Sequence, residues 1–212
     1  MTAETLRAGP IADAIRRQRL LVVLRRVEPR DRLLALVDEL AAAGARIFEV
    51  TFDAPTAAED IAALRDRLEA RDGGPYVVGA GTIVSDGQLA AARACGAQFG
   101  VSPLFDPPLV RGAVEGGMPF IPGAFTPTEV ASAWATGATF VKLFPASAVG
   151  PQFVRELRGP LPEIQLIPTG GIDASNAPDF LEAGAVAVGI GSALTRAGAE
   201  ARQRIVAGLR AE

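Results

Sequence analysis

The sequence contains no histidine, a single cysteine and a single lysine, and each shortage excludes a class of chemistry. Without histidine there is no Ser-His-Asp triad, no Cys-His pair and no histidine-ligated zinc. Any general acid or base must then be a carboxyl group, a tyrosine, the lysine or water. Cys95 has no second cysteine with which to form an internal disulfide or a cysteine-rich metal cluster. We interpret it as a small core residue late in a helix.

Length and charge narrow the possibilities further. The 212 residues fit one domain spanning 1–212, and the formal net charge of −3 gives no electrostatic reason to expect nucleic acid as a partner. No apolar run is long enough to cross a bilayer. Residues 1–7 lack the apolar core of a signal peptide. Together with the lone cysteine, these features predict a protein of the reducing cytoplasm.

The one lysine, Lys142, lies in an apolar segment, 138–145, where an ammonium group is expensive to bury. Positive charge elsewhere comes from twenty arginines. Lysine, unlike arginine, can lose its proton and attack a carbonyl as a neutral amine. A compositional bias toward arginine accounts for the low lysine count but not for this position. We therefore interpret Lys142 as a candidate nucleophile.

Glycines recur at the ends of Ala-rich or amphipathic stretches, and a short apolar run follows each of them. The pattern is typical of a helix that ends on a left-handed glycine and leads into a buried strand. Several of these glycines are about 20 to 25 residues apart, the length of one strand-plus-helix unit. The glycines in this pattern are Gly44, Gly96, Gly117, Gly137 and Gly184.

Completing the pattern gives eight candidate strands, several of them nearly continuous apolar runs, as expected when both sheet faces are covered. Helical patterns fill the gaps, for example 31–43 and 152–158, and 4–17 predicts an extra helix before the first strand. Eight units in about 200 residues predict a (β/α)8 TIM barrel, with an open doubly wound sheet as the alternative. The predicted strands are 20–24, 47–52, 76–82, 99–103, 120–123, 140–144, 165–169 and 185–190.

Polar side chains gather where these strands end, which is where such a barrel carries its chemistry. Because side chains alternate along a strand, Glu49 and Lys142 would both point into the barrel. A purely structural ion pair is the alternative, but desolvation offsets most of the Coulomb gain of a buried pair. We therefore interpret the two residues as a candidate site.

The last two strands end in glycines, at Gly170-Gly171 and at Gly191, which Ser192 follows. Glycine has no side chain, so its backbone N–H group can approach a phosphate closely. The N-terminus of a helix that follows also favours the anion. Barrels often carry a phosphate site at this place, although glycine pairs also mark plain turns. The pattern indicates phosphate binding.

Short motifs along nearly the whole chain resemble those of the 2-keto-3-deoxy-6-phosphogluconate aldolase family, also called the KHG/KDPG aldolases, in the same order and spacing. The resemblance implies a homotrimeric class I aldolase that needs no metal and no other cofactor. The matching motifs are Phe48-Glu49-Val50-Thr51, Gly79-Ala80-Gly81-Thr82, Val101-Ser102-Pro103, Ile121-Pro122-Gly123, Val141-Lys142-Leu143-Phe144-Pro145, Pro168-Thr169-Gly170-Gly171 and Gly191-Ser192.

The resemblance also implies a role for each matching residue. Lys142 corresponds to the Schiff-base lysine of the family and Glu49 to its general acid/base. Thr82 corresponds to a ligand of the pyruvoyl carboxylate, Pro103 to a proline lining the pocket and Thr169 to a residue near the new stereocentre. The glycine-containing ends of the last two strands and the serine that follows correspond to its phosphate site.

One position departs from the family pattern, which continues Glu-Val-Thr-Leu-Arg with an arginine that binds the substrate carboxylate. Here Phe52 is followed by Asp53, which would repel a carboxylate. Arg25, at the end of the first strand, matches another family arginine, and we expect it to supply the charge. Asp53 would then either hydrogen-bond a substrate hydroxyl or point away.

The implied reaction is cleavage of 2-keto-3-deoxy-6-phosphogluconate, or a related 2-keto-4-hydroxy acid, to pyruvate and an aldehyde. The aldehyde is glyceraldehyde 3-phosphate for the phosphorylated six-carbon acid and glyoxylate for 4-hydroxy-2-oxoglutarate. The residues leave the gluconate and galactonate epimers open. Two other functions also stay open: a phosphosugar isomerase or epimerase with Lys142 as an electrostatic clamp, and a non-catalytic phosphometabolite-binding barrel.

Overall fold

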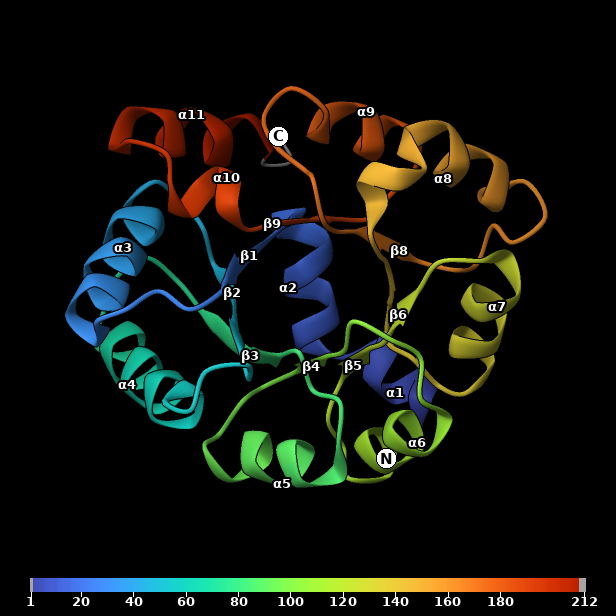
Figure 1. The fold of residues 1–212 in the computed structure, drawn as a ribbon, viewed down its shortest axis with the longest axis horizontal. Coiled ribbons are helices and arrows are strands. Elements are labelled where there is room, and N and C mark those ends of the chain that lie inside the picture. Colours follow the sequence, from blue (N-terminus) through green and yellow to red (C-terminus); the bar gives the residue numbers. More distant parts are fainter. Residues whose placement is uncertain (1, 210–212) are drawn as a thin grey trace.

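The computed structural model describes residues 2–209, in which strands and helices alternate along the chain. The strands curve around the centre of the molecule, and most of the helices lie outside them (Figure 1). The strands are β1 (Leu20–Leu24), β2 (Ile47–Thr51), β3 (Val77–Gly81), β4 (Gly100–Val101), β5 (Phe120–Ile121), β6 (Gly123–Ala124), β7 (Val141–Leu143), β8 (Leu166–Pro168) and β9 (Val188–Ile190). The helices are α1 (Ala3–Arg7), α2 (Pro10–Gln18), α3 (Arg30–Ala42), α4 (Ala57–Glu69), α5 (Asp86–Ala94), α6 (Pro107–Glu115), α7 (Pro127–Ala135), α8 (Gly150–Arg158), α9 (Ala177–Glu182), α10 (Ser192–Thr195) and α11 (Ala199–Leu209).

All five predicted helix-ending glycines adopt the left-handed conformation, with φ between 74° and 112°. After each glycine, the next residue donates its backbone N–H to a carbonyl in the last turn of the helix, as Ala45 does to Leu40 at 2.9 Å. This bond is part of the Schellman motif, which satisfies a helix-end carbonyl and redirects the chain. The predicted sequence of helix, glycine and strand is confirmed.

Parallel pairing joins the strands into two curled sheets. Within residues 2–209, six strands pair in the order β5-β4-β3-β2-β1-β9 and three in the order β6-β7-β8. β1 pairs with both β2 and β9, so strands from the two ends of the chain are neighbours. In the open doubly wound alternative the first and last strands do not pair, so the observed strand order differs from it. An isolated bridge between Thr169 and Gly189 connects the end of β8 to β9.

The α/β fold with a curled parallel sheet agrees with the sequence prediction, but the ladders do not run as one continuous eight-stranded sheet in the described residues. The predicted strand 120–123 is divided into β5, which pairs with β4, and β6, which pairs with β7. Pro122 lies at the division and has no backbone N–H to contribute to a ladder. The strands β4 and β9 are each three residues shorter than predicted, and β2, β3, β7 and β8 are shorter by one or two residues.

The N-terminal segment forms two helices where one was predicted, because Gly9 is extended and Pro10 begins α2. Ala12 and Ile15 of α2 pack among inward-facing strand side chains such as Ile47 and Phe140. Phe48, next to Ile47 in β2, packs instead in the layer between strands and helices, which confirms the predicted alternation. Since α2 leads directly into β1, it closes the end of the interior at which the strands begin. The opposite end is left for a site.

No helix in the described part of the chain is long and apolar enough to cross a membrane.

Gly79 of β3 provides a test of interior packing, because a methyl group at this position would overlap the ring of Phe99. We expect Gly79→Ala to lower the free energy of unfolding by about 1–3 kcal/mol through overpacking. Gly112→Ala in α6 is the matched control, since its methyl group would lie at an ordinary 3.7 Å from Leu89. This control should raise stability by about 0.4–1 kcal/mol by restricting the unfolded chain. Urea unfolding followed by circular dichroism measures both variants, and equal stability of Gly79→Ala and wild type would contradict the packing.

Candidate active site

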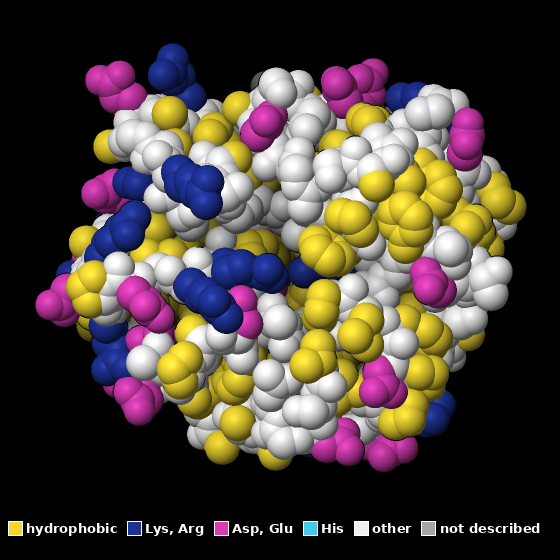
Figure 2. Space-filling view, viewed as in Figure 1, with side chains coloured by type: hydrophobic (Ala, Val, Ile, Leu, Met, Phe, Trp, Pro, Cys, Tyr) yellow, Lys and Arg dark blue, Asp and Glu magenta, His cyan; other side chains and the backbone are white. Residues whose placement is uncertain are grey.

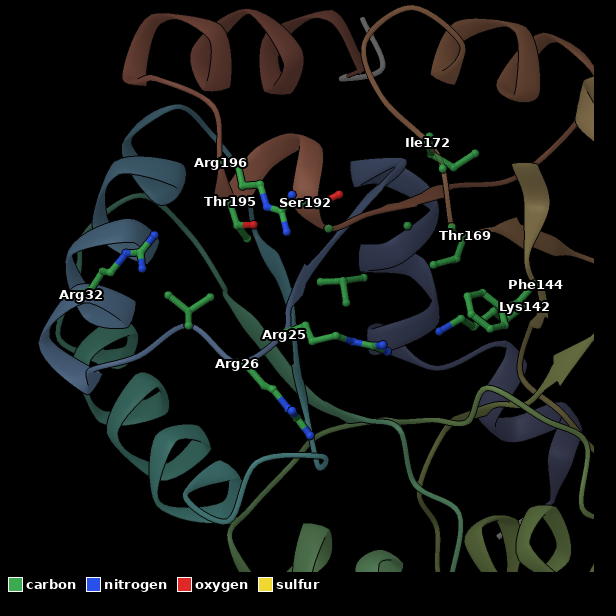
Figure 3. Close-up of a pocket in the computed structure, with 16 residues that line it drawn as sticks. Arg25, Arg26, Arg32, Lys142, Phe144, Thr169, Ile172, Ser192, Thr195 and Arg196 are labelled. Carbon is green, nitrogen blue, oxygen red and sulfur yellow. The ribbon is translucent and has the colours of Figure 1, made fainter. Parts of the chain in front are cut away.

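A pocket with a volume of about 550 Å³ lies at the carboxyl ends of the strands. Lys142 is at one side of this pocket, Arg32 and Arg196 are at the other, and Arg25 lies between them (Figure 3). The lining residues are Val23, Arg25, Arg26, Val27, Arg32, Lys142, Phe144, Thr169, Gly170, Gly171, Ile172, Gly189, Gly191, Ser192, Thr195 and Arg196.

The lining is strongly cationic. It includes four arginines and Lys142 and, among the described residues, no carboxylate, although the chain as a whole has a net charge of −3. Lysine and arginine side chains also gather on the left half of the face shown in Figure 2. A cleft lined by charges of one sign concentrates ligands of the opposite sign. The pocket is therefore suited to an anionic small molecule.

Lys142 is buried, with 4% of its surface exposed, at the centre of β7. Its backbone neighbours are Gly123 of β6 and Ile167 of β8, which fix the side chain toward the interior. Its Nζ atom lies 5.1 Å from the centre of the Phe144 ring. Burial lowers the pKa of Lys142, Glu49 opposes this shift and Arg25 adds to it. A lower pKa increases the fraction of neutral, nucleophilic amine at neutral pH.

Glu49 of β2 is also buried, and neither of its carboxyl oxygens has a hydrogen-bond partner in the described residues. The carboxyl group lies against Gly81, where any side chain would overlap it. Burial raises the pKa of Glu49, while the charges of Lys142 and Arg25 oppose the shift. A carboxyl group with a raised pKa and no fixed partner is suited to proton transfer.

Arg25 forms part of a small polar cluster above β1, β2 and β3. Its Nη2 atom lies 3.4 Å from Thr82 Oγ1, and its Nε atom lies 3.9 Å from Asp53 Oδ2. Asp53 is closer to Arg26, whose Nε lies 3.4 Å from the same oxygen and whose Nη2 donates a hydrogen bond to the Asp53 carbonyl at 3.0 Å. Two arginines thus offset the negative charge of Asp53, and Asp53 itself does not line the pocket.

The backbone is strained on two sides of this cluster. Arg26 has φ of 48° and Thr82 has φ of 59°, both in the left-handed region that non-glycine residues rarely adopt. Such residues concentrate at functional sites, where the surrounding structure holds them in place. The strain supports a functional role for this corner of the pocket.

The two glycine-containing strand ends line the same pocket. Gly170 and Gly171, with φ of 92° and 74°, line the pocket together with Gly191 and Ser192. Thr169 also lines it and is almost fully buried. The helix that follows Gly191 is only four residues long, so backbone N–H groups here offer more to an anion than the helix dipole does.

Several outcomes differ from a simple reading of the sequence. Glu49, Thr82 and Pro103 are not among the residues that line the pocket, and Pro103 is half-buried beside Gly123. Conversely, the lining includes Arg32 and Arg196, for which the sequence offers no signal. Their positions depend on how α3 and α10 pack beside the strands.

The described residues contain no group of three or more histidine, cysteine, aspartate or glutamate side chains placed to hold a metal ion.

The family model for KDPG and KHG aldolase matches residues 11–207. The chain belongs to this family. The 2-dehydro-3-deoxy-6-phosphogalactonate aldolase of Escherichia coli K12 is 35% identical over 84% of this chain and 85% of its own length. The 2-dehydro-3-deoxy-phosphogluconate aldolase of Treponema pallidum (strain Nichols) is 38% identical over 81% of this chain and 79% of its own length.

Solved structures agree with the family assignment. A 4-hydroxy-2-oxoglutarate/2-dehydro-3-deoxyphosphogluconate aldolase from TTHB1 has a TM-score of 0.82 and 33% identity, covering 95% of this chain and 96% of that one. A native KDPGal structure has a TM-score of 0.80 and 32% identity, covering 90% and 91%. The resemblance seen in the sequence is therefore confirmed, and this aldolase-family protein is a lyase of the aldolase type.

The lowered pKa of Lys142 can be measured directly, because no other lysine competes for an amine reagent. We expect reductive methylation of Lys142, quantified by peptide mass spectrometry, to have a pH midpoint below the ordinary lysine pKa of about 10.4. In Glu49→Gln the midpoint should fall further, since the carboxylate that raises the pKa is gone. A midpoint at or above the ordinary value in wild type would contradict the burial of this amine.

Proposed function

We propose that this protein is a class I aldolase that cleaves a 2-keto-3-deoxy-6-phospho sugar acid, of the gluconate or galactonate type, or 4-hydroxy-2-oxoglutarate. Its products are pyruvate and an aldehyde. The observation that carries the proposal is a single lysine, buried in the wall of a cationic pocket, whose pKa is lowered by that burial. The substrates named for the relatives are anionic keto acids of this class.

The reaction begins at Lys142. Its neutral amine attacks the C2 ketone to form a carbinolamine, which loses water to give an imine. The protonated imine withdraws electrons from C3 and prepares the C3–C4 bond for cleavage. Arg25 and Lys142 point toward each other across the pocket (Figure 3), so the positive charge of Arg25 favours the unprotonated amine before attack.

Glu49 acts as the general acid/base. It accepts the proton of the C4 hydroxyl through a water, since its carboxyl group lies behind the pocket surface. The C3–C4 bond breaks, the aldehyde leaves, and an enamine remains on Lys142. Protonation at C3 and hydrolysis of the imine release pyruvate and restore the lysine. The absence of a hydrogen-bond partner for the Glu49 carboxyl within the described residues leaves both oxygens available for this proton transfer.

The two ends of the substrate are bound by different groups. Arg25 neutralises the carboxylate beside the ketone, with Thr82 next to it as a hydrogen-bond donor. Thr169, which lines the pocket and is almost fully buried, contacts the substrate near the carbon that carries the C4 hydroxyl. The backbone of the glycine-containing ends, Gly170-Gly171 and Gly191, together with Ser192, binds the phosphate.

We also propose that residues 1–212 form a single domain whose strands complete a (β/α)8 barrel, with β5 and β6 as one strand interrupted at Pro122. The Thr169–Gly189 bridge and the shared interior cluster around α2 support this closure. A crystal structure would test it by the ladder between β8 and β9 and across Pro122. Pro103, beside Gly123, would then support the wall beneath the pocket.

We further propose that the enzyme is a homotrimer of the reducing cytoplasm, where a lone cysteine is typical. Val84, Leu104 and Phe125 are exposed on loops after β3, β4 and β6, and apolar side chains gather on the right half of the face in Figure 2. Burial of such a surface favours association. Sedimentation equilibrium should give about three times the chain mass of 21.9 kDa, and a monomer mass would contradict the trimer.

Lys142→Arg tests the Schiff base. We expect this variant to fold but to lose at least roughly 10³-fold in kcat, because the guanidinium group stays protonated and cannot attack a ketone. Wild type incubated with pyruvate and borohydride should gain a reduced adduct on Lys142, detected by mass spectrometry, and the variant should gain none. Near-normal turnover of the variant in a coupled pyruvate-release assay would end the Schiff-base mechanism.

Arg25→Ala tests the carboxylate site. A charge-assisted hydrogen bond contributes about 1.5–3 kcal/mol, so kcat/KM should fall by roughly 10- to 150-fold. Asp53→Ala should cost much less, since Asp53 contacts Arg25 and Arg26 and does not line the pocket. Pyruvate-release kinetics measure both variants. A silent Arg25→Ala with an inactive Asp53→Ala would show that Asp53, and not Arg25, contacts the substrate.

A further inference from the structure

The end of the pocket far from Lys142 contains two cations that the reaction chemistry does not use. Arg32 comes from the first turn of α3, and Arg196 directly follows α10. Both line the pocket, on the side where Ser192 and Thr195 also lie (Figure 3). This end is separated from Lys142 by the middle of the pocket, so these arginines are placed for the distal part of a bound molecule.

Neither arginine has a partner within residues 2–209. Most arginines of the described chain form a hydrogen bond or an ion pair with protein groups, as Arg30 does with Glu59 and Asp60. Those without such a bond among the described residues are Arg17, Arg19, Arg32, Arg111, Arg196 and Arg204. Of these, Arg32 and Arg196 line the pocket. Their donors are therefore available to a ligand.

The other cations of the pocket cannot neutralise a distal anion equally well. Lys142 lies at the opposite end of the pocket, and Arg25 lies between the two ends, beside Thr82 and Asp53. Arg26 contacts Asp53 through both its side chain and the Asp53 carbonyl. The glycine backbone supplies N–H donors with partial charges only. A phosphate bound by the backbone and the hydroxyl of Ser192 would therefore keep most of its charge unless Arg32 and Arg196 contact it.

We propose that Arg32 and Arg196 bind the terminal phosphate of the substrate and make the enzyme select phosphorylated over unphosphorylated keto acids. The inference rests on the proposed function, because it assigns a phosphate to the far end of the same pocket. Guanidinium groups present paired N–H donors that match phosphate oxygens. Backbone N–H groups then position the phosphate, and the two arginines supply the charge that an unphosphorylated analogue cannot use.

The kinetic test compares 2-keto-3-deoxy-6-phosphogluconate with unphosphorylated 2-keto-3-deoxygluconate in wild type, Arg32→Ala, Arg196→Ala and the double variant. Because both arginines are exposed, we expect each single change to lower the phosphorylated-to-unphosphorylated ratio of kcat/KM by about 5- to 10-fold, and the double change by about 30-fold. Arg17→Ala is the matched control, since Arg17 also has no partner in the described residues and lies on α2 at the closed end. The control should keep the wild-type ratio, and a wild-type ratio in the double variant would overturn the proposal.

A binding test does not depend on turnover. Isothermal titration with glycerol 3-phosphate should give at least about 10-fold weaker binding to the double variant than to wild type or Arg17→Ala. Raising the ionic strength should reduce this difference, because the contacts are between exposed charges. Equal affinity for all three proteins would also overturn the proposal. If wild type cleaves neither these two acids, nor the galactonate epimer, nor 4-hydroxy-2-oxoglutarate, the proposed function fails, while the titration still decides whether the arginines bind phosphate.

Discussion

The site depends on the burial of one amine and one carboxyl group in the same interior. Lys142 and Glu49 come from β7 and β2, and each is almost completely removed from water. Desolvation penalises the charged form of both groups, whereas their opposite charges favour the charged forms. Because Glu49 has no hydrogen bond from the described residues, the pair is not fixed in one protonation state by protein contacts. Burial therefore makes the neutral amine and the protonated carboxyl more accessible than they are in water.

Small residues make that burial possible. Any side chain at Gly81 would overlap the carboxyl group of Glu49, and any side chain at Gly189 would overlap Thr169. The glycines of β3 and β9 therefore set the space available beneath the pocket, while α2 excludes water from the closed end. The same residues also weaken the strands, since glycine has no side chain to pack. These glycines thus make space for polar groups in the interior, but they lower the stability of their strands.

Charge is distributed unevenly over the molecule. The chain is acidic overall, yet arginines from α3 and from the segments after β1 and α10 surround the pocket without any lining carboxylate among the described residues. Asp53 lies behind Arg25 and Arg26 and limits their positions. Anionic groups can therefore be attracted to different parts of one pocket, with Lys142, the proposed nucleophile, at the side away from Arg32 and Arg196. This arrangement relates the family membership of the chain to a specific orientation of the substrate.

The sequence by itself determined the alternation of helix, glycine and strand, because a left-handed glycine and an apolar run act through neighbouring residues. It also indicated Lys142 as a candidate nucleophile, since a lone lysine in an apolar segment is visible without any structure. The glycine-containing strand ends at Gly170, Gly171, Gly191 and Ser192 could be located from the same local pattern. The family motifs indicated the aldolase reaction.

Only the tertiary structure decided how these parts meet. The division of one predicted strand at Pro122 depends on which neighbour each half pairs with, and the split of the N-terminal helix depends on α2 packing into the interior. The contact of Asp53 with Arg26, and the position of Arg32 and Arg196 at one end of the pocket, join residues distant in sequence or on separate elements. Local sequence patterns do not predict such distances, because the packing of the helices against the curled sheets determines them.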